Sequence, residues 1–421
     1  TTSNIGLEET GTYCVYCSGA GTGGTFVNST NTSNNNYVWA ADDVLMCAYD
    51  DSTGKFWLGK NGTWFESGNP ATSANPNFTV VAADRGDVYP AFAYYASTDG
   101  MRFNLGADSS FQGSKTAQGN TDGNGIGDFY YTPPSGFVAL CSDNLSDPSI
   151  ADPTAHFNTV TYAGDDATSR SITGAGFQPD FSWIKNRTSS CDHVLFDVVR
   201  GVADTAAGKQ LSSNLTSAEP SNTNGHIKSF DSDGFSLRDG SSGSEPRLNT
   251  NKGSTNYVAW NWKAGGTAVS DSSGDITVSR STNTDNGISI ISYTGNQDPA
   301  GTGETIAHGL SQAPEIAFFK NRDGTNDWIV GCTPVGWTQY ASLNQTDAFS
   351  ASNSPFRDTA PTSSYITLGG SHSLNKSAND YICYAFHSVD GYSKVGSYEG
   401  NANADGPFVY TGFKPAFVII K

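Results

Sequence analysis

Short apolar runs separated by polar turns make up most of this chain. Near its start, Val44-Leu-Met-Cys-Ala-Tyr49 and Lys55-Phe-Trp-Leu58 are joined by Asp51-Ser-Thr-Gly54. The pair Asn61-Gly62 then stands before Thr63-Trp64. An Asn-Gly pair next to apolar runs is a strong β-hairpin signal, because both of its residues tolerate a positive φ. The pattern therefore predicts antiparallel hairpins between residues 44 and 64.

The pattern of short strands continues in the second half. Ile288-Ser-Ile-Ile-Ser-Tyr293 and Pro314-Glu-Ile-Ala-Phe-Phe319 are apolar runs bounded by Gly, Pro and Asn, at a spacing that suits a β-sandwich. The best helix candidate, Val202-Ala-Asp-Thr-Ala-Ala207, has six residues between two glycines, too few to carry an amphipathic face. We predict an all-β fold.

One phrase of the sequence occurs three times. Pro179-Asp-Phe-Ser-Trp-Ile-Lys-Asn-Arg187 returns as Pro314-Glu-Ile-Ala-Phe-Phe-Lys-Asn-Arg322 and again as Pro415-Ala-Phe-Val-Ile-Ile-Lys421. The lysines of successive copies are 135 and 101 positions apart. The second half of the chain is therefore a tandem array with two complete copies and the start of a third.

The ends of the repeat also recur. Each copy opens on a Tyr-x-Gly step, at Tyr162 to Gly164, Tyr293 to Gly295 and Tyr398 to Gly400. The complete copies close on an Asn-Lys pair and an aromatic run, with Asn251-Lys252 before Tyr257 to Trp262 and Asn375-Lys376 before Tyr381 to Phe386. This second offset is 124, so the middle of the unit has lost 11 residues, which surface loops tolerate. A unit of this length predicts a row of autonomous domains and not a solenoid.

These patterns divide the chain into six segments. We expect a first β-sandwich with an incomplete N-terminus over 1–148 and a linker over 149–153. The first repeat domain then covers 154–266, a linker 267–286, the second repeat domain 287–390 and the start of a third 391–421. Thr267 to Thr284, rich in Ser, Asp and Thr, fits either a linker or a paired excursion.

Composition and charge exclude some partners. Only 15% of the 421 residues are charged, and 23 basic against 41 acidic residues give a net charge of −18. This balance repels phosphate backbones and anionic lipid, so we expect no nucleic-acid partner. Apolar residues never run together for about 18 positions, so we expect no membrane insertion.

The seven cysteines do not form one framework shared by the copies. Cys383 stands where the first copy has Ala259, and Cys191 aligns with Asn326. Such exchanges indicate small thiols, and we expect assembly in a reducing cytoplasm. The first residues, Thr1-Thr-Ser-Asn4, show neither an initiator Met nor a signal peptide, so we expect a piece of a longer protein.

The span from Asp43 to Pro148 resembles the SPRY family, a bent β-sandwich used as a binding module. The residues that carry the resemblance are Val44 to Tyr49 with the Asp50 to Gly54 turn, Phe56-Trp-Leu-Gly-Lys-Asn-Gly62, Tyr89-Pro-Ala-Phe92, Phe103-Asn-Leu-Gly106 and Pro133-Pro-Ser-Gly-Phe137. The resemblance implies a SPRY-like sandwich ahead of tandem β-sandwich repeat domains, and it brings no catalytic residue.

The repeat units resemble those of structural and tail-fibre proteins of marine bacteriophages. Tyr381-Ile-Cys-Tyr-Ala-Phe-His387, Gly391-Tyr-Ser-Lys-Val-Gly-Ser-Tyr398 and Gly412-Phe-Lys-Pro-Ala-Phe417 carry this resemblance. It implies a virion structural protein, assembled in the host cytoplasm, with other virion proteins and host-surface glycan as partners. It also implies that the chain could form a homo-oligomer.

Few residues are candidates for chemistry. Asp122, Asn124 and Asp128 stand in Asp122-Gly-Asn-Gly-Ile-Gly-Asp128, which is like part of a calcium loop but lacks the bidentate Glu, so a structural cation competes there with a plain Gly-rich loop. Trp64 and Tyr95 lie near turns and could stack on sugar rings, although most aromatic residues of a β-rich chain fill cores. Otherwise we expect no metal and no cofactor.

The Lys-Asn-Arg step of the repeat has two interpretations. Arg187 and Arg322 could clamp an anionic ligand. Their recurrence at equivalent positions favours a structural role, in which a strand end pairs its cations with acidic loops.

The function expected from all of this is attachment to a host surface, or virion assembly, through multivalent binding in a tail fibre or similar appendage. A bacterial cell-surface adhesin built from the same modules is the first alternative. A glycan depolymerase is the second, because acidic residues are many and their separations are invisible in a sequence. The six histidines are scattered and no nucleophile motif occurs, so we expect no enzyme and no catalytic residue.

Overall fold

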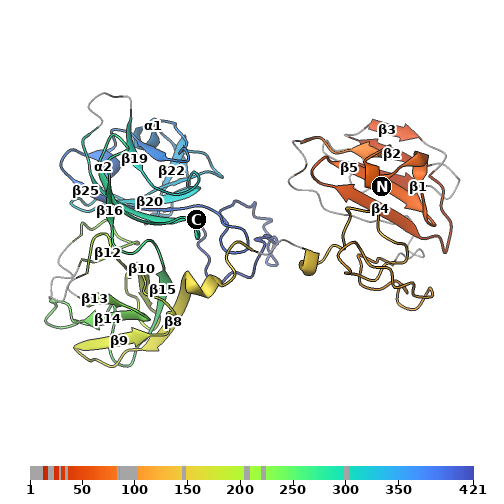
Figure 1. Cartoon of the computed structure of the whole chain (residues 1–421). Coiled ribbons are helices and arrows are strands. Elements are labelled where there is room, and N and C mark those ends of the chain that lie inside the picture. The colour runs from red at the N-terminus through yellow and green to blue at the C-terminus, as the bar shows by residue number, and fades with distance from the viewer. Residues whose placement is uncertain are drawn as a thin grey trace. The chain divides into compact units, whose positions relative to one another are not determined.

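The computed structural model describes residues 13–17, 23–27, 30–33, 37–82, 85, 102–144, 148–202, 209–219, 224–297, 301 and 303–421. The chain divides into two compact units, Thr1–Ser146 and Asp147–Lys421 (Figure 1). Antiparallel sheets form both units, which confirms the predicted all-β fold. None of the helices in the described part of the chain is long and apolar enough to cross a membrane. The helix candidate at 202–207 falls largely outside the described residues.

Two small sheets are present in the described residues of the N-terminal unit. The first has the order β1-β2-β3 and the second β4-β5-β6, with β7 paired to β5. The strands are β1 (Tyr13–Cys17), β2 (Gly23–Val27), β3 (Thr30–Ser33), β4 (Leu45–Asp50), β5 (Lys55–Lys60), β6 (Thr63–Trp64) and β7 (Phe78–Thr79). Short 3-10 helices are η1 (Phe65–Ser67), η2 (Pro70–Thr72) and η4 (Ser142–Asn144).

The predicted hairpins are present in this unit. Strands β4 and β5 pair from Leu45 and Lys60 to Asp50 and Lys55. Between β5 and β6, Asn61 and Gly62 have φ of 50° and 86°, the positive pair that a two-residue hairpin turn requires. The segment 89–92, which also carries the SPRY resemblance, lies outside the described residues, so that resemblance stays a prediction.

The first repeat copy is a two-layer β-sandwich. Its main sheet has the order β12-β11-β10-β15-β8 and its second sheet the order β13-β14-β9 (Figure 1). After η5 (Pro153–Ala155) come β8 (Phe157–Ala163), β9 (Ser169–Thr173), β10 (Phe181–Asn186), β11 (His193–Asp197), β12 (Leu211–Ser212), β13 (His226–Asp231), β14 (Gly234–Arg238) and β15 (Asn256–Trp262).

The second copy repeats this strand order. Within its eight-stranded sheet, β18-β25-β20-β21-β22 corresponds to β8-β15-β10-β11-β12 of the first copy, and the pair β19-β24 corresponds to β9-β14. The elements are β18 (Ile288–Thr294), β19 (Glu304–Ala307), β20 (Ile316–Asn321), β21 (Ile329–Cys332), β22 (Gln339–Ser342), β23 (Ser350–Ala351), α1 (Asn353–Phe356), β24 (Tyr365–Leu368), α2 (His372–Asn375) and β25 (Asp380–Phe386).

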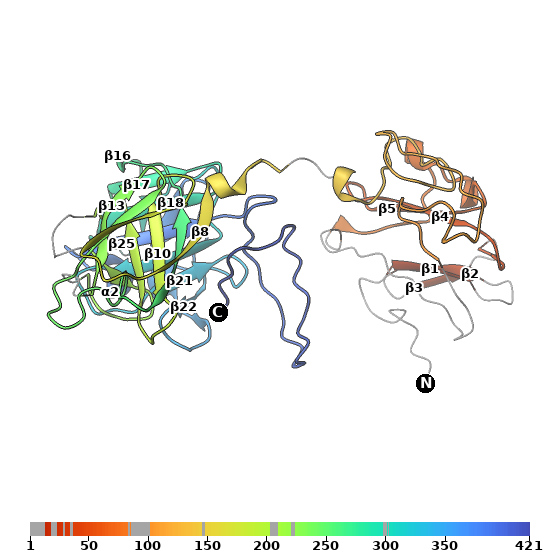
Figure 2. The same ribbon diagram turned by 90° about the horizontal axis from the view of Figure 1, so that it is seen from below.

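The two copies are not the autonomous domains that the repeat length predicts. Each has its own core, around Phe235 in the first copy and Phe319 in the second. A third cluster mixes both copies, because Phe181 and Trp183 of β10 pack with Phe318 and other residues of the second copy. Each main sheet therefore buries both faces, one against its own second sheet and one against the other copy. The strands of the two copies lie one above the other in Figure 1 and overlap in the view from below in Figure 2.

The expected linker at 267–286 is also wrong. Strand β16 (Val269–Asp271) pairs with β17 (Val278–Asn283), and β17 pairs with β18 of the second copy. The backbone N–H and C=O groups of this segment therefore form hydrogen bonds that extend the sheet. This is the paired excursion, the second of the two alternatives for the segment. The boundary before the repeats falls after Ser146, two positions earlier than expected.

The start of the third copy is irregular backbone laid against the first two. Phe417 packs on aromatic side chains of the first copy, among them Trp260 and Trp262, each with ring centroids 5.3 Å from its own. The Lys421 Nζ donates to the Gln345 carbonyl of the second copy at 2.6 Å. Other apolar residues of the segment are exposed, including Phe408 and Ile420.

Candidate docking site between the repeat copies

The residues singled out in the N-terminal unit do not form one site. Trp64 is half-buried on β6, with its ring over the backbone of Gly59 in the neighbouring strand. Tyr95 lies outside the described residues. A sugar-stacking role for these two aromatic residues stays a prediction.

The calcium-loop candidate is organised around hydrogen-bond donors. The Asp122 carboxylate accepts hydrogen bonds from the amides of Asn124, Ile126 and Ala139, at 2.9, 3.0 and 2.8 Å, and from the Asn144 side chain at 2.8 Å. The Ala139 amide is the largest influence that lowers the pKa of Asp122 to about 2. These four donors occupy the positions that a cation would need.

Asp128, the last residue of the calcium-loop candidate, does not join this arrangement. It donates its backbone amide to the Gly106 carbonyl at 2.8 Å and contributes no bond to Asp122. The structure therefore brings the Asp122 and Asn124 positions together and leaves Asp128 apart from them.

The recurring Tyr-x-Gly and Asn-Lys motifs meet in both complete copies and support each other. Tyr162 stacks on Tyr257 with ring centroids 5.2 Å apart, as Tyr293 stacks on Tyr381 at 5.2 Å. The Tyr257 hydroxyl accepts the Lys252 amide at 2.8 Å, and the Tyr381 hydroxyl the Lys376 amide at 2.7 Å. The motifs are therefore structural.

The glycine of the Tyr-x-Gly step is required by close packing. A Cβ on Gly164 would collide with the carbonyl oxygen of Lys252, and one on Gly295 with that of Lys376. The strand that opens each copy can approach its closing loop only because no side chain intervenes.

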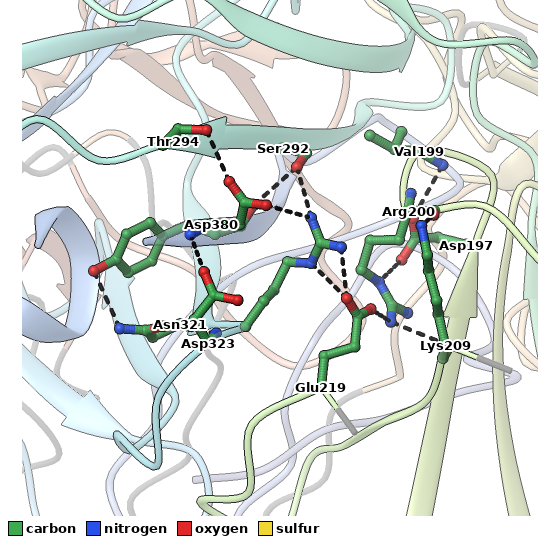
Figure 3. A network of polar contacts seen from close by, with 12 residues as sticks. Asp197, Val199, Arg200, Lys209, Glu219, Ser292, Thr294, Asn321, Asp323 and Asp380 are labelled. Atoms are coloured by element: carbon green, nitrogen blue, oxygen red, sulfur yellow. Dashed lines mark hydrogen bonds and ion pairs between the residues drawn. The ribbon is translucent and has the colours of Figure 1, made fainter. Parts of the chain in front are cut away.

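A buried ion-pair network joins the two copies (Figure 3). In the first copy, Arg200 donates to the Asp197 carboxylate at 2.5 Å, and both side chains are fully buried. Glu219 of the same copy lies between two guanidinium groups, accepting from Arg200 at 2.7 Å and from Arg322 of the second copy at 2.5 Å. Tyr384 of the second copy donates to Asp197 at 2.7 Å.

Glu219 carries a full charge at neutral pH because of this arrangement. Burial alone would raise the pKa of its carboxyl group, but the two guanidinium groups of Arg200 and Arg322 outweigh burial, so the pKa lies below its ordinary value. Its backbone amide also donates to the Arg322 carbonyl at 2.6 Å. Side chain and backbone together fix the loop of the first copy to the strand end of the second.

Lys320 makes a second polar contact across the same junction. This fully buried side chain projects from β20 on the face toward the first copy. Its Nζ donates to four carbonyl oxygens, of which Thr216 belongs to the first copy, at 3.1 Å. The others belong to Asn321, Gly324 and Asn326, at 2.8, 3.0 and 2.9 Å. Burial lowers the pKa of Lys320 to about 8.

A hollow of about 470 Å³ lies near the junction, beside the start of the excursion. Residues of the first copy, among them Gln178 and Lys263, line it together with residues 282–284 of the excursion. The carboxylate of Asp180, which also lines the hollow, accepts hydrogen bonds from the amides of Ala264 and Gly266 at 2.8 and 3.1 Å. This carboxylate therefore stabilises the turn that follows β15.

Within the described residues, no three His, Cys, Asp or Glu side chains gather as metal ligands. The clustered carboxylates, Asp197 and Glu219, are those of the junction, and their partners are arginines. The arrangement can hold two protein modules together, with charge, hydrogen bonds and aromatic packing in one interface.

Sequence reasoning found one side of this junction and missed the other. Arg322 stands in the repeated phrase, and the favoured structural interpretation, with cations paired to an acidic loop, describes it well. Arg200 and Glu219 lie outside the repeated phrase, so nothing in the sequence indicated their role. The weak signal available was apolar residues on both faces of β10, at Trp183 and Ile184, which indicates a sheet covered on both sides.

The fold and junction define an all-β protein with tandem repeats docked through a buried ion-pair network. Residues 152–421 match the family described as a domain of unknown function (DUF7483), which is more than half of the chain, so the chain belongs to this family. No curated protein and no solved structure matches the chain.

Proposed function

We propose that this protein is a structural component of a virion appendage, such as a bacteriophage tail fibre, that attaches to a host surface through several weak sites. The observation that carries the proposal is the docking of the two copies, in which Glu219 of one copy binds Arg322 of the next and the main sheets share a core. A flexible linker would be enough for a protein that only tethered its modules, and such a protein would not need a core shared between them.

Rigid docking matters for multivalent binding. Where two modules hold a fixed spacing, the second binding event is intramolecular and proceeds at a high effective concentration. The junction fixes the spacing of equivalent loops on the first and second copies, so a repeating glycan or protein surface could engage both. The carboxylates of Asp197 and Glu219 accept hydrogen bonds from arginine side chains. These ion pairs explain why the two acids are buried, so no catalytic role is needed to account for them.

Gold labelling of purified virus particles tests this proposal. Antibodies raised against the folded repeat region, residues 152–421, should decorate one defined appendage of particles from a culture that carries the gene. Purified chain should also adsorb to host cells and reduce attachment of the particles. Label on the bacterial envelope with bare particles would contradict the proposal and favour an adhesin, and release of reducing sugar from host glycan would favour a depolymerase.

A further inference from the structure

Asp180, in the hollow beside the excursion, uses only one of its two carboxylate oxygens within the protein. The side chain is 3% exposed, and the same oxygen accepts both of its amide hydrogen bonds. The second oxygen accepts no hydrogen bond within the part of the chain that the structure describes, although the residue lines the hollow. Burial is the largest influence on the pKa of Asp180 and raises it. A buried acceptor in this situation needs a partner, and the hollow is where one can reach it.

The other polar side chains around the hollow also have groups that are not engaged. Gln178, Lys263 and Thr284 are exposed, and their side chains form no hydrogen bond or ion pair with other described residues. The side-chain oxygen of Asn283 accepts the Asp285 amide at 3.0 Å, whereas its Nδ2 group donates to no described residue. The hollow therefore offers hydrogen-bond donors and acceptors side by side, with one negative and one positive charge.

The second copy satisfies the equivalent groups with its own residues. Glu315 stands at the position of Asp180 and accepts the Ser388 amide at 2.6 Å. The Gln312 side chain donates to the Ser388 carbonyl at 3.1 Å, and the Val395 amide donates to the Ser388 hydroxyl at 2.9 Å. Polar groups that bind one another in the second copy thus have no protein partner in the first copy.

An uncharged ligand rich in hydroxyl groups matches this lining. A sugar hydroxyl donates one hydrogen bond and accepts two, so it can donate to the second oxygen of Asp180 and accept from Asn283 or Lys263. An anionic ligand would meet the carboxylate and a cationic ligand the ammonium group, and such like-charge contacts are unfavourable. The volume of about 470 Å³ lies within the range of about 300–1,000 Å³ that is usual for small-molecule sites.

We propose that this hollow binds a neutral sugar unit of a glycan, with a sugar hydroxyl donating to the second carboxylate oxygen of Asp180. None of the described residues that line the hollow is aromatic, so no ring stacks on the sugar and a single site is weak. Weak sites are those that gain most from repetition along an appendage. The inference rests on the proposed function, because it names the ligand class of one of the weak sites proposed there.

Saturation-transfer difference NMR of the full chain tests the site, with the methyl glycosides of glucose, galactose, mannose and N-acetylglucosamine as probes. At least one of these neutral sugars should receive saturation, and glucuronic acid and glucosamine should receive less. Asp180→Asn should weaken binding by about tenfold or more, because its amide oxygen can still serve the turn while its NH₂ group replaces the free acceptor. Gln178→Ala changes only an exposed side chain, so it should leave folding intact and weaken binding by about threefold.

Asp405→Asn is the matched control, because it makes the same replacement at an exposed carboxylate of the third copy's start. It should bind the sugars like the unaltered chain. The proposal is overturned if no neutral sugar receives saturation, if a charged sugar is preferred, or if Asp180→Asn and Gln178→Ala both bind like the control.

The use of free sugars keeps this test separate from the labelling of particles. Sugar binding by a chain that labels no particle would retain the site and remove the appendage role. Labelled particles together with a chain that binds no sugar would retain the appendage role and remove the site.

Discussion

The Glu219 carboxylate accepts two hydrogen bonds from the Arg322 guanidinium, at 2.9 and 2.5 Å, although 103 positions of the chain separate them. The same carboxylate binds Arg200, so one acid neutralises a cation from each copy. Breaking such a buried arrangement by removing one partner is strongly destabilising, because the remaining charges stay buried without compensation.

Glu219→Gln should therefore destabilise the repeat region by about 3 kcal/mol, since it leaves Arg200 and Arg322 without their shared counter-charge. Differential scanning calorimetry of the full chain is the measurement. Glu399→Gln, at an exposed carboxylate, is the control and should leave the melting temperature unchanged. Equal melting curves for both variants would show that the ion pair does not hold the copies together.

The contribution of Glu219 should depend on pH with a defined sign. Its pKa is lower in the folded protein than its ordinary value of 4.5, so the stabilisation is present above that value and is lost as the pH falls through the folded pKa. The stability difference between the unaltered chain and Glu219→Gln should stay constant from about pH 7 to about 5 and shrink below about 4.5. Denaturant titrations across this range measure it, and a difference that grew on acidification would contradict the assignment.

Lys320→Met should destabilise the protein by roughly 3 kcal/mol, because it removes the donor shared by four carbonyl oxygens in buried or partly buried contacts. Lys185→Met is the matched control at the equivalent position of the first copy, where the half-buried lysine donates to the Cys191 carbonyl of the same copy. Urea denaturation of the two variants measures the free energy of unfolding. If Lys185→Met lowered the free energy of unfolding more than Lys320→Met, the stabilising role given to the junction would be contradicted.

The same lysine makes stability depend on pH in the alkaline range. With a folded pKa of about 8 against 10.5 when unfolded, the unfolded chain holds more protons between these values. The free energy of unfolding of the unaltered chain should therefore rise with pH in this window relative to that of Lys320→Met. Urea denaturation of both chains at several pH values measures the difference, and an equal pH dependence of the two chains in this window would show that Lys320 keeps its charge at the junction.

Replacing the glycine of the Tyr-x-Gly step by alanine should reduce stability in the two complete copies but not in the start of the third. Gly164→Ala and Gly295→Ala should each destabilise the protein by about 2 kcal/mol or more, because the new Cβ meets a carbonyl oxygen. Gly400→Ala, at the same motif position, meets nothing within 4 Å and should be neutral. Thermal unfolding followed by circular dichroism distinguishes them, and equal effects at all three sites would contradict the packing argument.

Calcium should not stabilise the N-terminal unit. Since Asp122 already accepts four hydrogen bonds, unfolding of the full chain should be the same in calcium and in a chelator. Asp122→Ala should lower the melting temperature of this unit in either solution, because it leaves the buried Ala139 amide without its acceptor. A chelator-dependent transition would establish the cation site that the sequence pattern suggested.

The sequence predicted those parts of the fold that depend on the residue types of a short segment. Positive φ at Asn61 and Gly62 could be expected from residue type, and the repeated register of Lys320 and Arg322 identified a recurring strand end. Glu219 could not be found this way, since it lies in a loop and its importance comes from a partner 103 positions away. The shared core was missed because alternation along one strand does not show what covers its outer face.

The shared core also bears on how this protein would carry load. In the appendage proposed above, tension would pull on the chain from both ends, and modules joined by flexible linkers would unfold one at a time. Here the main sheets of the two copies are packed face to face around Phe181, Phe318 and Tyr384, with the ion pairs beside them. The two copies would therefore resist stretching as one element and extend together in a single long step.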